Sequence, residues 1–331
     1  MNELRLEEVS VRYSRSDGAH VRAVDAVSLR LSAGRVLGLV GETGCGKSSI
    51  GRVAAGIVAP TSGRVLADGR PLEALGRRGR RREDLPLQMV FQDPFASLNP
   101  RRRVAAQLGD GLAAAGVRAD DRPARARALL ARVGLEPDSA GRYPHEFSGG
   151  QRQRIAIARV LAARPSIVVA DEPISALDAS AQAQIAGLLR GLVAEEGVGM
   201  MFISHDLSVV RHVADEVAVM YLGRIVERAP VEELWAAPRH PYTRALIGAI
   251  PRADGRGVLP DALGGEVPDP AAPPAGCHFR PRCPDAFERC PRRPALAAVS
   301  PATEVACFLH HDEVDEPAAD GRSMRARHAR A

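Results

Sequence analysis

The chain has 331 residues, of which 45 % are apolar and 26 % charged, and this is ordinary for a globular protein but too long for one average domain. It has no run of 18 or more apolar residues and begins without a signal-peptide core, so we expect it neither to span a membrane nor to leave the cytosol. Its net charge of +5 is carried largely by arginine, with runs at 77–82 and 322–330. These runs could contact nucleic acid or acidic lipid, but we favour solvated loops and expect no nucleic-acid partner.

Alternation of apolar residues and short apolar runs predict strands in the first part of the chain, at residues 3–12, 24–31, 35–40, 64–67 and 86–92. A helix is predicted at 49–55. Residues 102–142 are rich in Ala, Leu and Arg at helical spacing and contain few β-branched residues, so we expect a helical insert there.

After residue 148 the pattern again alternates helices with strands. Helices are predicted at 151–163 and 180–195, and unbroken apolar strands at 167–170 and 199–203. Such strands favour a parallel sheet covered on both faces. The Pro-, Gly-, Ala- and Asp-rich residues 251–276 predict a linker, and the polar residues 312–331 predict a disordered tail.

A glycine-rich turn lies between the strand at 35–40 and the helix that follows it. Residues 41–48, GETGCGKS, fit G-x-x-x-x-G-K-[ST], the Walker A loop that cradles nucleoside triphosphate with backbone N–H groups. Lys47 would reach the β- and γ-phosphates, and the Ser48 hydroxyl would bind Mg²⁺. The residues predicted to contact ATP here are Gly41, Glu42, Thr43, Gly44, Cys45, Gly46, Lys47, Ser48 and Ser49.

Acidic and imidazole side chains follow the next apolar strands. Asp171 ends one of these strands, where open α/β sheets bind ligands, and its carboxylate could hold Mg²⁺. Its neighbour Glu172 is placed to activate the attacking water. His205 would sense the γ-phosphate, although a strand-end histidine taken alone is more often structural.

A second phosphate-binding pattern occurs at residues 147–154, FSGGQRQR. The Ser148 hydroxyl and the N–H groups of Gly149 and Gly150 open a predicted helix and could grip an anion. A single ATP site does not need two such phosphate-binding motifs. The pattern is explained if this face meets the nucleotide held by another copy of the domain.

In order and spacing, these motifs resemble those of the ATPase subunits of ABC transporters over about residues 3–250. The resemblance implies an α/β P-loop NTPase with an antiparallel β subdomain, a helical subdomain at about 100–150, and head-to-tail dimers that bind two ATPs and drive a permease. Gln92 matches the Q-loop glutamine, which is catalytic and a possible Mg²⁺ ligand, and Tyr13 the aromatic residue that stacks on adenine. The matches to the signature motif and the D-loop add Ser148, Gly149, Gly150, Gln151 and Asp178.

Three segments narrow the resemblance to the oligopeptide, dipeptide and nickel importers. They are residues 88–100, 143–146 and 240–246. The chain is most similar to the second of the two ATPase subunits in those systems. This implies a heterodimer on the cytoplasmic face of the inner membrane, two permease subunits and an extracytoplasmic solute-binding protein. Peptide is favoured as cargo over nickel and other small solutes.

Four of the five cysteines form a C-terminal group with the spacing C-x5-C-x6-C-x16-C: Cys277, Cys283, Cys290 and Cys307. In a cytosolic protein we expect metal ligands here rather than disulfides. Zinc, an iron–sulfur cluster and unliganded thiols all stay open, with His278 or His310 as extra ligands. The resemblance favours a [4Fe–4S] cluster in a Cys-rich extension, residues 277–311.

Two other readings remain. Arginine runs also occur in soluble ABC-type ATPases that act on nucleic acid, but such proteins usually carry two fused ATPase units or a long insertion, and this chain has neither. A regulatory pseudo-ATPase is disfavoured because Lys47, Asp171, Glu172 and His205 are all present.

Overall fold

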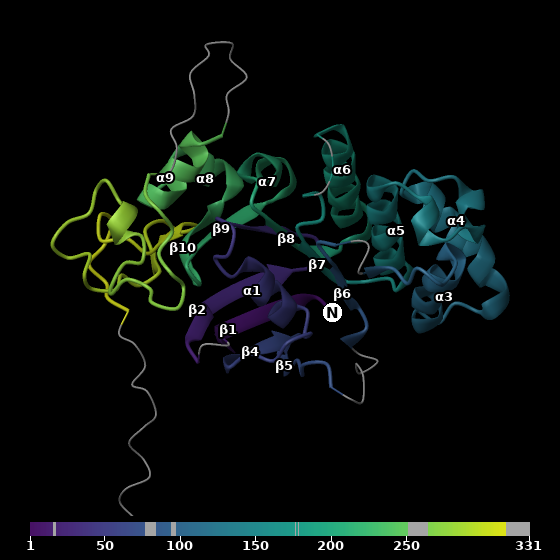
Figure 1. Ribbon diagram of the computed structural model, residues 1–331, viewed down its shortest axis with the longest axis horizontal. Coiled ribbons are helices and arrows are strands. Elements are labelled where there is room, and N and C mark those ends of the chain that lie inside the picture. The colour runs from purple at the N-terminus through teal and green to yellow at the C-terminus, as the bar shows by residue number, and fades with distance from the viewer. Residues whose placement is uncertain are drawn as a thin grey trace, which may run out of the picture.

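The computed structural model describes residues 1–15, 18–76, 84–93, 97–175, 177, 179–250 and 264–315. The arginine runs, Asp178, residues 251–263 of the predicted linker and most of the predicted tail lie outside these ranges. The described residues form two sheets, helices around the larger sheet with α1 on the side of the smaller one, and a C-terminal extension at the far edge of the larger sheet (Figure 1).

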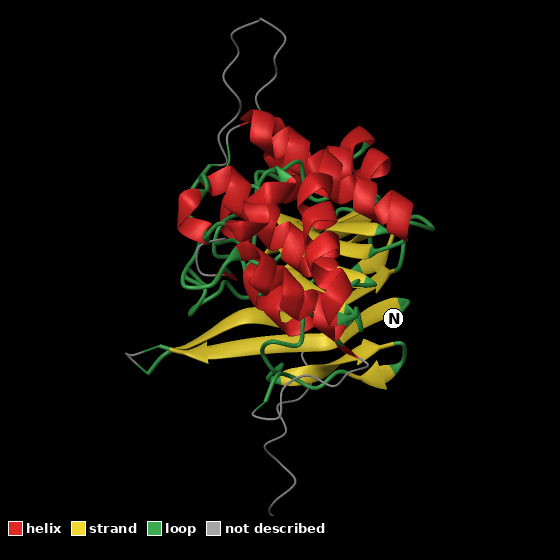
Figure 2. Ribbon diagram, turned by 90° about the vertical axis from the view of Figure 1, so that its right-hand side faces the viewer, coloured by secondary structure: helices red, strands yellow, loops and turns green. Residues whose placement is uncertain are grey.

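The smaller sheet is antiparallel, in the order β2-β1-β4-β5. Its strands are β1 (Glu3–Ser14), β2 (His20–Ser32), β4 (Ser62–Ala67) and β5 (Arg70–Pro71). The long β1–β2 hairpin buries Leu4, Leu6, Leu29 and Leu31 toward the larger sheet, as its alternation predicts. Figure 2 shows this sheet beneath the larger one.

The larger sheet has the order β11-β12-β10-β9-β3-β8-β7-β6. Five neighbouring strands are parallel: β6 (Leu87–Val90), β7 (Ile167–Asp171), β8 (Gly199–Ser204), β3 (Val36–Val40) and β9 (Glu216–Tyr221). The parallel arrangement predicted from the apolar strands is present in these five, and the strand direction changes beyond β9. There β10 (Arg224–Pro230) returns antiparallel, because the turn at Leu222–Gly223 is too short for a parallel crossover.

Helices cover the larger sheet in two groups (Figure 1). The first group, called the helical subdomain below, contains α3 (Val104–Ala114) and α4 (Arg122–Arg132) from the predicted insert, together with α5 (Gly149–Ala162), the helix predicted at 151–163. The others are α1 (Lys47–Ala54), α6 (Ala179–Glu196), α7 (Leu207–Val213), α8 (Val231–Ala236) and α9 (Pro241–Gly248). None of the helices in the described part of the chain combines the length and hydropathy that a bilayer crossing needs.

The C-terminal extension packs on the main domain. Its strand β12 (Glu304–Val305) pairs with β10, and β11 (Ala297–Ala298) pairs with β12. The side chain of Phe279 is 2 % exposed and belongs to the main core, so the extension uses a core that it could not build alone. Val314, within the predicted tail, forms a β-bridge with Pro294 of the extension.

Candidate nucleotide-binding site

Four parallel strands deliver the predicted ATP-site residues to one edge of the sheet. In the register, the C-terminal residues of β3 and β7 both lie beside β8. The chain therefore leaves β3, β6, β7 and β8 on the same side. The residues that follow these strands are Gly41, Gln92, Glu172 and His205.

The Walker A loop requires glycine at specific positions. Gly46 has φ 107°, and a Cβ there would lie 2.0 Å from the Ala23 carbonyl oxygen. Gly41 is equally confined, since its Cβ would lie 2.1 Å from the Met220 carbonyl oxygen. Only glycine lets the loop approach β2 and β9 this closely while its N–H groups turn toward the site.

Lysine, serine and aspartate meet at the start of α1. Lys47 is buried, and its Nζ donates to the Gly41 and Glu42 carbonyls at 2.7 and 2.9 Å. The Ser48 hydroxyl donates to Asp171 Oδ1 at 3.0 Å. Burial raises the pKa of Asp171, although the Ser48 hydrogen bond opposes this. A hydroxyl and a buried carboxylate side by side form a fitting donor set for Mg²⁺.

Glu172 is the centre of a second group. Gln92 Nε2 donates to Glu172 Oε2 at 3.0 Å, and His205 Nδ1 lies 3.4 Å from Glu172 Oε1. The backbone of Glu172 has φ 44°, and its N–H donates to the Ile203 carbonyl at 3.0 Å. A non-glycine residue in this region is strained, so the carboxylate is held by its surroundings rather than by local preference.

The signature motif caps α5 and faces outward. Ser148 Oγ accepts from the Gln151 N–H, and Gln151 Oε1 accepts from the Ser148 N–H, which makes a capping box. Ser148, Gly149 and Gln151 are exposed and Gly150 is partly exposed. The helix therefore presents its N-terminus to the outside of its own subunit.

The structure defines two of the predicted nucleotide contacts, Tyr13 and Asp178, less well. Tyr13 lies on β1 with its side chain 39 % exposed, which suits a stacking surface better than a core position. Asp178 lies outside the described residues. Of the remaining D-loop, the Ser175 hydroxyl donates to the Glu172 carbonyl at 3.1 Å.

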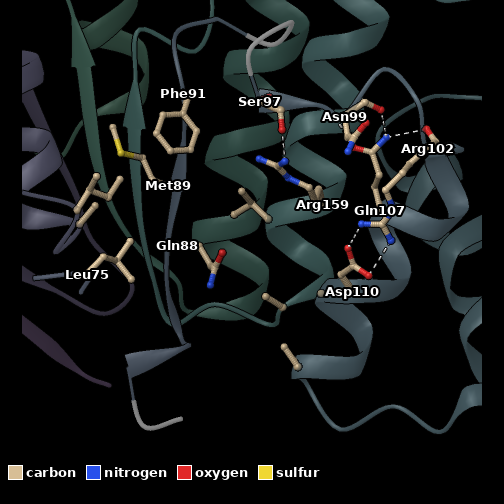
Figure 3. Close-up of a pocket in the computed structure, with 16 residues that line it drawn as sticks. Leu75, Gln88, Met89, Phe91, Ser97, Asn99, Arg102, Gln107, Asp110 and Arg159 are labelled. Atoms are coloured by element: carbon tan, nitrogen blue, oxygen red, sulfur yellow. Dashed lines mark hydrogen bonds and ion pairs between the residues drawn. The ribbon is translucent and has the colours of Figure 1, made fainter. Parts of the chain in front are cut away.

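A hollow of about 440 Å³ separates the helical subdomain from β6 (Figure 3). Met89 and Phe91 line one wall, and polar side chains of α3 and α5 line the other. Phe91 is 37 % exposed and directly precedes Gln92. Whatever enters this hollow would therefore touch the segment that carries Gln92 to Glu172.

The four C-terminal cysteines line one narrow cavity. Burial raises the pKa of Cys277 to about 12 and of Cys307 to about 11. Within the described ranges, no group of three or more His, Cys, Asp or Glu side chains is arranged to hold a metal ion. The extra ligands predicted do not join the cavity, because His278 Nδ1 lies 3.1 Å from the Leu222 carbonyl and His310 Nε2 lies 2.9 Å from that of Arg239.

Sequence reasoning missed two side chains that contact the Walker A loop. Tyr242 Oη accepts from the Glu42 N–H at 2.9 Å, and Arg282 binds the Glu42 carboxylate. Both lie in segments that were noted for other reasons, the 240–246 motif and the Cys-rich extension. Nothing in the local pattern indicated a partner some 200 or more positions away.

Comparison with known proteins agrees with this geometry. Residues 24–175 match the ABC transporter family model, and residues 226–290 match the C-terminal region of oligopeptide/dipeptide transporters. A protein of Brucella ovis named as a peptide import ATP-binding protein is 48 % identical, with 90 % of this chain and 95 % of that protein covered. The oligopeptide transport ATP-binding protein AppF of Bacillus subtilis is 47 % identical, with 88 % and 90 % covered.

Solved structures show the same fold. The dimeric ATP-binding cassette MJ0796, in a post-hydrolysis state with ADP and phosphate, is 27 % identical with a TM-score of 0.60, covering 69 % of this chain and 98 % of that one. CbiO1 from Clostridium perfringens, part of the cbiONQ transporter complex, is 31 % identical with a TM-score of 0.61, covering 71 % and 92 %. The chain therefore belongs to the family of ATP-hydrolysing subunits of ABC transporters and carries the C-terminal region of the oligopeptide/dipeptide branch.

Proposed function

We propose that this ATPase powers peptide import, as one half of a head-to-tail ATPase dimer on the cytoplasmic face of a membrane. The observation that carries the dimer is the exposed N-terminus of α5, which holds an anion-binding serine–glycine corner outside its own subunit. Support for peptide as cargo comes from the oligopeptide/dipeptide C-terminal region and from the names of the relatives.

Within the site, Lys47 and the loop N–H groups would hold the phosphates, while Ser48 and Asp171 would hold Mg²⁺, which neutralises the charge that develops during phosphoryl transfer. Glu172 would accept a proton from the attacking water. Gln92 contacts Glu172 Oε2 and His205 contacts Glu172 Oε1. Because the two side chains hold different oxygens, together they fix the plane of the carboxylate. Tyr13 would stack on adenine.

The test is Glu172→Gln in the full chain. The amide cannot accept the proton, so ATP turnover falls by about 100-fold or more while binding survives. The variant then accumulates as an ATP-bound dimer, measured by size-exclusion chromatography with and without MgATP. The wild type run beside it serves as the control. Normal turnover in the variant would remove Glu172 from this role, and a variant that forms no dimer with ATP bound, either alone or mixed with the second ATPase subunit, would refute the dimer.

The surface of the subunit also indicates which other proteins of the transporter it contacts. The hollow beside β6 is open and mixed apolar and polar, and it adjoins Gln92, so we assign it to a segment of the permease. The full assembly would hold a second, different ATPase subunit, two permeases and an extracytoplasmic binding protein. Reconstitution with the neighbouring genes' products should give ATP-dependent uptake of a labelled tripeptide. Uptake of nickel instead would favour the alternative cargo.

We further infer a [4Fe–4S] cluster at the cysteine cavity. All four cysteines of the extension line it. Beside them His240 is 1 % exposed, its Nδ1 accepts from the Tyr242 N–H, and its Nε2 has no partner. A buried donor that faces a cavity needs an acceptor, and thiolate or sulfide sulfur would supply one.

The cluster is tested by its colour and its metal content. Anaerobically purified protein should absorb broadly near 400 nm and contain about four iron atoms per chain. Cys290→Ser should remove both, whereas Cys45→Ser, at the one cysteine outside the cavity, should keep them. Colourless protein with one zinc per chain would establish the zinc alternative. Protein purified without any metal would instead show that the four cysteines are unliganded thiols.

A further inference from the structure

The C-terminal extension reaches into the phosphate-binding loop through one arginine. Arg282 Nη1 and Nη2 bind the two carboxylate oxygens of Glu42 at 2.7 and 3.0 Å. The Arg282 side chain is only 3 % exposed, so this bidentate pair is largely shielded from water. Glu42 is the second residue of the Walker A loop, and 240 positions separate the partners.

The backbone of Glu42 is held from the same side. Its N–H donates to Tyr242 Oη, and its carbonyl accepts from Lys47 Nζ, which is itself a phosphate ligand in the proposed mechanism. Tyr242 is fully buried, and its ring centroid lies 5.3 Å from that of Phe279 in the extension. Every polar group of Glu42 is thus fixed by Lys47, by the extension or by a residue packed on it.

Charge gives this contact a consequence for ATP. Glu42 is a carboxylate in a loop that must accept a highly negative triphosphate, and an unpaired charge there would repel it. Arg282 neutralises that carboxylate with a charge from the extension. A bidentate guanidinium fixes direction as well as charge, which a lysine ammonium does not.

We propose that Arg282 is a positioning residue for ATP binding, through which the C-terminal extension holds the Walker A loop in its binding shape. Its proposed effect on the nucleotide is indirect, because Arg282 acts through Glu42. Arg282 ends the turn Arg280–Arg282 and directly precedes Cys283, so the arginine that binds the Walker A loop adjoins a cysteine of the cavity.

The test separates binding from chemistry in the full-length chain. Arg282→Ala should raise the Kd for a fluorescent ATP analogue and the KM for ATP about fivefold, with kcat within about twofold. Arg282→Lys should fall between the wild type and the alanine variant. Glu42→Gln in the Arg282→Ala background should restore much of the affinity, because it removes the unpaired carboxylate.

The matched control is Glu304→Gln, which removes an ion pair between the extension and Arg228 of β10, away from the loop. It should leave Kd and KM unchanged. The proposal fails if folded Arg282→Ala binds the analogue normally, if Glu42→Gln rescues nothing, or if Glu304→Gln weakens binding as much. If Arg282→Ala does not fold, Arg282→Lys is the deciding variant. A Kd and a KM equal to those of the wild type in Arg282→Lys would then refute the proposal.

Discussion

Asp171 is buried, and burial disfavours the charged form of its carboxylate when no cation is bound nearby. Its side chain is buried, and this burial raises its pKa despite the hydrogen bond from Ser48. A raised pKa means that the folded state binds the proton more tightly than the unfolded chain. Its contribution to stability is therefore complete below the ordinary carboxyl pKa and is lost as the pH rises through the folded pKa.

Asp171→Asn should therefore stabilise the nucleotide-free protein at pH 7 by about 1 kcal/mol, or about 2–4 °C in Tm, because the amide still accepts from Ser48 without a charge. The gain should shrink as the pH falls into the carboxyl range. Thermal unfolding between pH 4.5 and 8 measures it, while Mg²⁺-dependent ATP hydrolysis is lost.

Asp68 provides the opposite case for comparison. Burial raises its pKa, but hydrogen bonds from the Asn2 and Glu3 N–H groups outweigh this and lower it. Its stabilising effect is present at neutral pH and is lost on acidification. Asp68→Asn should thus lower Tm at pH 7. If Asp171→Asn instead loses stability at pH 7, burial does not determine the pKa of Asp171.

At the residue level, the sequence predicts what is local. Lys47, Ser48, Asp171 and Glu172 stand at strand ends in short patterns, and the structure places them together. The roles assigned to them stay predictions until measured. Arg282 could not be found this way, because its meaning depends on a docking surface that exists only in the folded chain.

At the level of elements, the extension is held by its aromatic anchor. Phe279 packs against Tyr221 and Tyr242, with both ring centroids at 5.3 Å. Phe279→Ala should destabilise the protein by about 3–4 kcal/mol, since a buried ring leaves a cavity in the main core. It should also weaken ATP binding if Arg282 acts as proposed. Urea unfolding and nucleotide titration measure the two effects.

Leu309→Ala is the control in the same extension. This side chain is 44 % exposed, so its removal should cost less than about 1 kcal/mol. Equal losses in the two variants would mean that Phe279 does not anchor the extension.

The strands that could be predicted are those with strong local patterns. Apolar runs located β3, β7 and β8, and alternation located β1 and β2. The strands β11 and β12 have two residues each and no pattern of their own, because only the pairing of β12 with β10 and of β11 with β12 makes these residues strands. The strands β9 and β10, which form a hairpin in the structure, were also not among those predicted.

At the level of the whole molecule, the subunit carries the Walker loop and the signature corner on different elements. The Walker loop precedes α1, under the centre of the larger sheet, whereas Ser148 opens α5 in the helical subdomain to one side (Figure 1). Ser148 is exposed, so a large cation placed there should not disturb its own subunit's ATP site. It should block only the contact with the triphosphate of a second subunit.

Ser148→Arg in the Glu172→Gln background should therefore bind a fluorescent ATP analogue with an affinity within about twofold of the parent but remain monomeric with MgATP. Ala113→Arg, at an exposed position of α3, should still dimerise and so exclude a general effect of added charge. Analytical ultracentrifugation at matched nucleotide occupancy distinguishes these outcomes. A Ser148→Arg double variant that dimerises like its parent would place the second phosphate grip outside the interface, because a guanidinium and a triphosphate could not both occupy the serine–glycine corner.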